Sequence, residues 1–427
     1  MSNQNNHYLS SDWHLDRRCF GRKTVILLID GMRQDMVFSS DRQSAAKMRF
    51  LDSARRGKSR IAGIRGSYSA VVKVQSPTVT LPRIKCLTTG RVPGFLDVLW
   101  NFFASELATD SIVRRWNSAN FSVQFYGDDT WTRMFPGSFA KAQGLPSFFA
   151  TDFYEVDKNV TENLRVALDA SSNWDVLILH YLGLDHIGHI EGPNSRLVPD
   201  KLAEMDAVVE SIVTALSSQP VDWLLAVTSD HGMSDLGGHG GASPAETRTP
   251  LVLLSSVQLS SSLDPSIELP ELEQTDMANL LTSWTGVQPP RASLGLLHPS
   301  LGGLACGGFS NSLLSNNWLD LLELEAELNS KSEAFNRSER SKRCAENLNY
   351  CYSEARKAQQ ALVYASAEYS LPRMLIGLGL GCLCCLFRLP TLLQAVDMKT
   401  AKSNGPNEFK SAEDRISTCA VGLSVTQ

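Results

Sequence analysis

The stretch Val25-Ile-Leu-Leu-Ile29, followed directly by Asp30, is a short apolar run that stops at a carboxylate. Two later apolar runs, residues 176–181 and 223–229, also lead into clusters of aspartate and histidine. Strands of a parallel sheet that are buried on both faces show such continuous apolar runs, and their carboxyl ends meet at one edge. The sequence therefore predicts a parallel sheet whose carboxyl edge collects metal-type ligands.

Apolar runs and helical stretches alternate between residues 21 and 260, which is typical of an α/β fold. The expected fold is a doubly wound, mostly parallel sheet with helices on both faces. We expect strands at 24–29, 70–74, 121–126, 176–181, 223–229 and 250–255, and helices that include 96–116 and 198–217.

The texture of the chain changes after about residue 260, where Ser-, Pro- and Gly-rich segments appear. An amphipathic helical tail should follow, because residues 317–369 are apolar at helical spacing. The fourteen apolar residues 374–387 fall short of the roughly 20 that a membrane span needs, so a buried helix and a membrane contact both stay open. The predicted parts are a disordered N-terminus (1–20), a catalytic domain (21–287), a connector (288–316), a helical region (317–370), a weak membrane-segment candidate (371–396) and a disordered tail (397–427).

Composition excludes some classes of protein. The chain has 427 residues and a net charge of −5, which gives no electrostatic basis for binding nucleic acid. Of the nine cysteines, Cys86 alone lies among the motifs, so we expect a metal site of oxygen and nitrogen ligands rather than a disulfide scaffold. Residues 1–20 are polar and contain no apolar segment of the kind found in signal peptides.

The spacing of the polar residues suggests two metal ions. Asp185 and His189 are four residues apart and would share one face of a helix; His239 would complete the first ligand set. Zinc suits such ligands, and manganese stays open. Each residue alone would more often be structural, but all of them follow strands in a workable order. The second ligand set would be Asp30, Asp230, His231 and Thr80.

Thr80, in Pro77-Thr-Val-Thr-Leu-Pro82, is the candidate nucleophile, in a loop stiffened by the two prolines. A threonine hydroxyl attacks well only when its pKa is lowered, for example by coordination to a metal. Thr78 and Ser76 are the competing choices. Two metals about 3.5–4 Å apart suit an in-line displacement at phosphorus.

These motifs together resemble the alkaline phosphatase superfamily, and within it the branch of phosphodiesterases and phosphoethanolamine transferases. The resemblance covers roughly residues 22–256. It is carried by Ile29-Asp-Gly-Met-Arg33, Pro77-Thr-Val-Thr-Leu-Pro-Arg83, Phe125-Tyr-Gly-Asp-Asp-Thr-Trp131, His180-Tyr-Leu-Gly-Leu-Asp-His-Ile-Gly-His189 and Ser229-Asp-His-Gly-Met233.

The resemblance implies the same two ligand sets, two divalent ions that would be Zn²⁺, and Thr80 as nucleophile. It also implies that Asn101 binds a phosphoryl oxygen. The implied reaction moves phosphoethanolamine from phosphatidylethanolamine to a mannose of a glycosylphosphatidylinositol (GPI) precursor through a covalent threonine intermediate. Tyr126, Asp128, Asp129 and Trp131 are candidates to bind the ethanolamine ammonium through cation–π and carboxylate contacts. The equal alternative is that these four residues only close off a loop and pack.

The implied location is the endoplasmic reticulum membrane, with the catalytic domain in the lumen and a possible small stabilising membrane subunit. Relatives begin with a membrane anchor and continue into many transmembrane helices, so we expect this chain to be a shortened form. The sequons at Asn120, Asn159 and Asn336 fit a luminal glycoprotein.

Four other interpretations compete with the transferase. A metal-dependent phosphodiesterase would use the same site to hydrolyse its substrate, and a truncated isoform would be an inactive, non-catalytic partner. A sulfatase would need a modified cysteine or serine in place of Thr80, and a phosphomutase of this superfamily would need a serine.

Overall fold

The computed structural model describes most of the chain between residues 22 and 367. The membrane-segment candidate 371–396, the two predicted disordered ends and Asn101 lie outside the described residues. The described ranges are 22–38, 48–93, 107, 109–146, 150–169, 172–259, 269–304, 318–319, 321–326 and 336–367.

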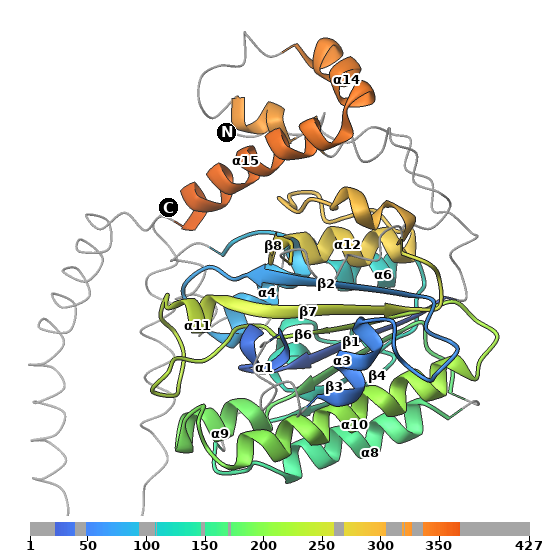
Figure 1. The fold of residues 1–427 in the computed structure, drawn as a ribbon, viewed down its shortest axis with the longest axis vertical. Coiled ribbons are helices and arrows are strands. Elements are labelled where there is room, and N and C mark those ends of the chain that lie inside the picture. The colour runs from blue at the N-terminus through green and yellow to red at the C-terminus, as the bar shows by residue number, and fades with distance from the viewer. Residues whose placement is uncertain are drawn as a thin grey trace, which may run out of the picture. The chain divides into compact units, whose positions relative to one another are not determined.

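The described residues form one sheet of eight strands in the order β4-β3-β5-β1-β6-β7-β2-β8 (Figure 1). Only β7 runs antiparallel to its neighbours, so the predicted mostly parallel sheet is confirmed. The two strands missed by the sequence, β4 and β8, are short edge strands without a long apolar run. The strands are β1 (Lys23–Ile29), β2 (Gly66–Lys73), β3 (Val123–Asp128), β4 (Lys141–Leu145), β5 (Val176–Tyr181), β6 (Trp223–Thr228), β7 (Arg248–Ser255) and β8 (Glu271–Glu273).

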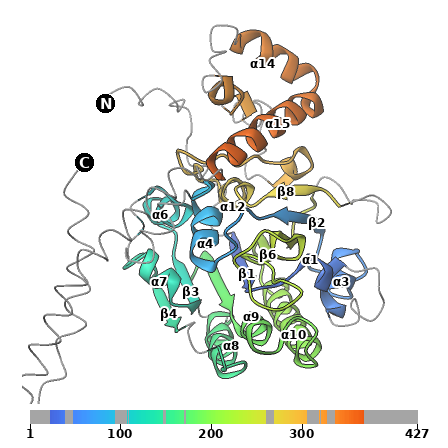
Figure 2. The same cartoon turned by 90° about the vertical axis from the view of Figure 1, so that its left-hand side faces the viewer.

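Helices cover both faces of the sheet, as a doubly wound fold requires (Figures 1 and 2). Alternate residues of β1 point to opposite faces: Ile26 and Leu28 join one apolar cluster, while Val25 and Leu27 join the other. The first cluster packs under α4 (Thr80–Thr89), α6 (Ile112–Ser118) and α12 (Asp276–Thr285). The second packs under α3 (Arg49–Arg55), α8 (Glu155–Ala167), α9 (Gly183–Glu191) and α10 (Leu197–Ser217).

The two helices whose ranges were predicted from the sequence compare differently with the structure. The helix expected at 198–217 is α10, which begins one residue earlier. The helix expected at 96–116 falls largely on residues outside the described ranges, and its described part begins only at Ile112. Ser111 sets that start, because its hydroxyl accepts a hydrogen bond from the backbone N–H of Arg114 as an N-cap.

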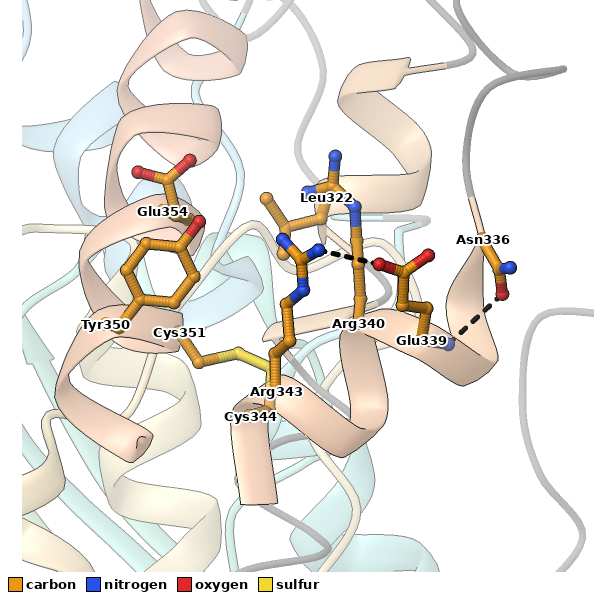
Figure 3. Close-up of a pocket in the computed structure, with 9 residues that line it drawn as sticks. All are labelled: Leu322, Asn336, Glu339, Arg340, Arg343, Cys344, Tyr350, Cys351 and Glu354. Carbon is orange, nitrogen blue, oxygen red and sulfur yellow. Dashed lines mark hydrogen bonds and ion pairs between the residues drawn. A yellow bond between two sulfur atoms is a disulfide. The ribbon is translucent and has the colours of Figure 1, made fainter. Parts of the chain in front are cut away.

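The helical region contains α14 (Arg337–Glu346) and α15 (Leu348–Ala367), which the disulfide Cys344–Cys351 joins. A cavity of about 220 Å³ lies against α14 and α15, and no predicted site residue lines it (Figure 3). Cys351, Ala355, Ala358 and Leu362 of α15 are buried at helical spacing, so the predicted amphipathic face is present. Among the helices of the described ranges, none is both long and apolar enough to cross a bilayer.

A buried polar network fixes α15 to α12. The Arg356 guanidinium donates to Asp276 at 2.7 Å, and the Gln359 amide donates to the other carboxylate oxygen. The network lies beside β8, where the Gln274 side chain donates to the backbone carbonyl of Asp230 at 2.7 Å. The tail thereby supports the edge of the sheet that carries Asp230.

Glu273 in this network makes stability depend on pH. Burial, and then the charge of Asp276, raise the pKa of Glu273 to about 7 from 4.5. Because the folded state raises the pKa of Glu273, the protonated carboxyl makes its full contribution to the free energy of unfolding below about pH 4.5. This contribution is lost as the pH rises through about 7. We expect Glu273→Gln to increase the free energy of unfolding at pH 8 by about 2 kcal/mol, with little change at pH 4.5, in urea denaturation.

The exposed Glu271 on the same strand pairs with Arg248 at the surface and provides the matched control. Glu271→Gln should change stability by less than about 0.5 kcal/mol at either pH. An equal effect of Glu273→Gln at pH 4.5 and pH 8 would contradict the assigned role of its ionisation.

Candidate metal centre

The predicted ligands gather at the carboxyl ends of three adjacent strands. β5, β1 and β6 are neighbours in the sheet; Asp30 directly follows β1, and Asp230 and His231 follow β6. α9, which follows β5, carries Asp185 and His189. Since β1 is flanked by strands that come later in the chain on both sides, this edge is the place where doubly wound folds bind ligands.

Asp185, His189 and His239 form the first group of ligand atoms, all within 4.8 Å of one another. The Nε2 atom of His189 lies 3.2 Å from one carboxylate oxygen of Asp185, and the Nε2 atom of His239 lies 3.8 Å from the other. The spacing of four residues does put Asp185 and His189 on one helical face. The third member comes from the Gly-rich loop after β6.

The second group surrounds His231. Its Nε2 atom lies 3.2 Å from Asp230, 3.6 Å from Asp30 and 3.3 Å from the hydroxyl of Thr80. The two groups adjoin, because the rings of His231 and His239 stack with centroids 4.0 Å apart. All seven predicted metal-site residues therefore lie in one cluster.

Two of these histidines, His231 and His239, are oriented by a hydrogen bond from the ring nitrogen that faces away from the cluster. The Nδ1 atom of His231 lies 3.0 Å from the carbonyl of Gly232, and that of His239 lies 2.6 Å from the carbonyl of Thr78. A carbonyl can only accept, so each Nδ1 carries the proton and each Nε2 keeps its lone pair. Both lone pairs are therefore available to the cluster, as in metal-binding histidines.

The electrostatics of the cluster favour a bound cation. Burial first, and then the charges of Asp230, Asp185 and Asp128, raise the pKa of Asp30 well above its ordinary value. One buried carboxylate oxygen each of Asp30, Asp185 and Asp230 has no hydrogen-bond partner among the described residues. Buried like charges with unused acceptor oxygens are costly alone and are neutralised by divalent ions. The donor set fits zinc or manganese.

Thr80 occupies a different local structure from the predicted loop. It is the first residue of α4, half-buried, and a helix N-terminus favours negative charge nearby. The competing Thr78 is fully buried: its hydroxyl donates to the carbonyl of Gly241 and accepts from the N–H of Gly240. The geometry favours Thr80 over Thr78, because only the Thr80 hydroxyl contacts the ligand cluster.

The ethanolamine cradle considered from sequence is mostly core. Trp131 is 0% exposed and stacks on Phe125, and Tyr126 is buried with its hydroxyl bonded to Gln124. Asp128 is buried too, while Asp129 pairs with Arg133. These contacts favour the packing alternative.

Sequence reasoning missed two supporting residues. His180, the next-to-last residue of β5, is 0% exposed with Nε2 3.3 Å from Asp30. Asp157 in α8 accepts hydrogen bonds from the backbone N–H groups of Leu182 and Gly183, where α9 begins. A histidine inside a fully apolar strand was a readable signal; the role of Asp157, 25 residues away, was not.

Comparison with known proteins gives a consistent set of relatives. The family model described as type I phosphodiesterase / nucleotide pyrophosphatase matches residues 24–241. The human protein named GPI ethanolamine phosphate transferase 2, catalytic subunit, is 43% identical over 300 residues, which is 69% of this chain and 29% of that protein. The Schizosaccharomyces pombe protein named GPI ethanolamine phosphate transferase 2 is 35% identical over 402 residues, covering 86% of this chain and 49% of that protein.

The chain thus spans less than half the length of these curated relatives. Among solved structures, the C-terminal periplasmic domain of EcEptC from Escherichia coli is 14% identical, with a TM-score of 0.47 over 68% of this chain and 87% of that chain.

Proposed function

The chain belongs to the type I phosphodiesterase / nucleotide pyrophosphatase family, and on this basis we propose that it is a phosphoethanolamine transferase acting in GPI-anchor biosynthesis. Its donor would be phosphatidylethanolamine, and its acceptor a mannose of a GPI precursor. The observation that carries the proposal is the contact of Thr80 with a cluster of three aspartates and three histidines. The names of the curated relatives support the substrate assignment.

In the proposed reaction, the hydroxyl oxygen of Thr80 attacks phosphorus and the diacylglycerol oxygen leaves from the opposite side. The phosphoethanolamine group is then carried on Thr80, and a mannose hydroxyl displaces the threonine oxygen in a second in-line step. When bound, two divalent ions would lower the pKa of the attacking hydroxyl and neutralise charge at phosphorus. Two inversions give net retention at phosphorus.

The proposed metal assignment has two ions, with Zn²⁺ the favoured element. Asp185, His189 and His239 would hold one ion. Asp30, Thr80, Asp230 and His231 would hold the other. Asn101 remains proposed as a ligand of a phosphoryl oxygen.

The proposed setting is the endoplasmic reticulum membrane, with this domain in the lumen, glycosylated and in contact with lipid. A small stabilising membrane subunit is a further proposed partner. The human relative is named a catalytic subunit, which supports a partner subunit.

Mass spectrometry of the full chain tests the function directly. Incubation with phosphatidylethanolamine is expected to add one phosphoethanolamine to Thr80, and a mannosylated GPI precursor should then discharge it. Thr78→Ala should still accumulate the adduct on Thr80, because the Thr78 hydroxyl is buried in loop hydrogen bonds. Discharge to water with no product on the sugar would favour the phosphodiesterase instead. An adduct on Thr78 would overturn the nucleophile.

Metal content gives an independent check. We expect elemental analysis of the purified chain to find two divalent ions, and His239→Ala to lose about one, because a three-residue ligand set loses one member. His186→Asn is the matched control: His186 lies on α9 between Asp185 and His189, but its ring bonds to the carbonyl of Asp152. An unchanged ion content in His239→Ala would contradict the assignment.

A further inference from the structure

His180 lies at the centre of the sheet, next to the metal centre. It is paired with Leu28 of β1 on one side and Gly127 of β3 on the other. Gly127 has a φ of +140°, and a Cβ there would lie 2.2 Å from the carbonyl oxygen of His180. The backbone around this histidine is therefore tightly packed, and the ring itself is fully buried.

His180 could serve the centre in two opposite ways. Its Nε2 atom falls within 4.8 Å of ligand atoms of Asp30 and Asp230, a distance that would suit a third metal ligand. The same atom lies 3.3 Å from Asp30 Oδ2, within hydrogen-bonding distance, although its orientation leaves Nε2 without a hydrogen-bond partner among the described residues. A ligand needs a lone pair on Nε2, whereas a donor needs a proton there.

Trp131 distinguishes between these two roles. Its indole Nε1 lies 3.2 Å from Nδ1 of His180, and an indole nitrogen can only donate. Nδ1 must therefore hold the lone pair, which puts the proton of the neutral ring on Nε2. His231 and His239 have the reverse arrangement, with protonated Nδ1 atoms facing carbonyls.

We propose that His180 is a positioning residue for Asp30, held by Trp131 in the tautomer that carries its proton on Nε2, beside the Asp30 carboxylate, and that it is not a metal ligand. His180 Nε2 lies on the Oδ2 side of Asp30, and a hydrogen bond formed there would leave Oδ1 facing His231 at 3.6 Å. Hydrogen bonds of this kind to ligating groups typically contribute 10- to 100-fold to metal affinity. The inference depends on the metal centre of the proposed function, but not on the donor or acceptor substrate.

Nitrogen NMR of the full chain, labelled with ¹⁵N-histidine, reads the tautomer directly. In the metal-free protein we expect His180 to be protonated at Nε2 and unprotonated at Nδ1, and to keep this state after zinc is added. A proton on Nδ1, or a zinc-induced shift typical of a metal-bound Nε2, would overturn the proposal. Zinc binding by the wild-type chain separately tests whether the centre exists.

Variants test the link from Trp131 to metal affinity. Trp131→Phe should remove the tautomer preference of His180 and weaken the binding of one zinc ion by about 10-fold or more, measured by chelator competition. His180→Leu should weaken the same ion similarly. His180→Gln, whose amide N–H can replace the Nε2–H, should recover part of the affinity.

Trp116→Phe is the matched control, because Trp116 is equally buried and its indole donates to Thr285 at 3.0 Å, in the same apolar cluster as Trp131. It should leave both the tautomer of His180 and zinc affinity unchanged. Equal loss of zinc affinity in the Trp116 and Trp131 variants, or no recovery with His180→Gln, would indicate a purely structural role and contradict the proposal.

Discussion

Replacing Thr80 by alanine is expected to lower the rate of the proposed phosphoethanolamine transfer by at least about 10³-fold, because the proposed covalent route loses its nucleophile. The hydroxyl of Thr80 is the only one among the described residues for which a contact with His231 Nε2 is observed. Thr80→Ser retains the hydroxyl and should keep transfer within about 100-fold of the wild-type rate. The measurement is release of diacylglycerol from labelled phosphatidylethanolamine in detergent.

Metal content and folding must be measured beside the rate. Thr80→Ala should keep Asp30, Asp230 and His231 in place, so a nearly complete ion content with lost transfer would identify the hydroxyl as the reacting group. Transfer by Thr80→Ala at more than about one tenth of the wild-type rate would exclude a threonine intermediate. It would leave direct attack by an acceptor or by water.

Replacing Asp157 by alanine is expected to cost about 3–5 kcal/mol in the free energy of unfolding. One carboxylate oxygen accepts from the N–H groups of Leu182 and Gly183, and the other pairs with Lys201 at 2.9 Å. Both Asp157 and Lys201 are buried, so the variant leaves an ammonium group without this partner and two backbone donors unsatisfied. Urea denaturation measures the loss.

The same variant should also weaken metal binding. α9 has no side-chain N-cap of its own, and Asp157 fixes its first turn, which carries Asp185. Glu155→Ala, at an exposed position in the first turn of α8, is the matched control and should cost less than about 0.5 kcal/mol. The double variant Asp157→Asn with Lys201→Met should be more stable than Asp157→Asn alone. If the double variant is no more stable than Asp157→Asn, the unpaired Lys201 ammonium is not the source of the lost stability.

The fold was largely predictable because its central strands are continuous apolar runs. β1, β5 and β6 are each buried along nearly their whole length, and short continuous apolar runs of this kind are typical of strands in a parallel sheet. The edge strands β4 and β8 were missed because an edge strand needs little apolar sequence. The start of α4 at Thr80 was missed because two flanking prolines suggested a loop, although Pro82 fits within a first helical turn.

The sequence by itself determined which residues are chemically able to form the candidate metal centre, since a residue's ligand type and its place after a strand are local properties. Tertiary structure alone decided which atoms face the centre. Trp131, a possible substrate contact from sequence, is instead a buried donor to His180, and Asp157 caps a helix that starts 26 residues later. Hydrogen-bond direction and burial depend on neighbours that are distant in the chain, and no local pattern encodes them.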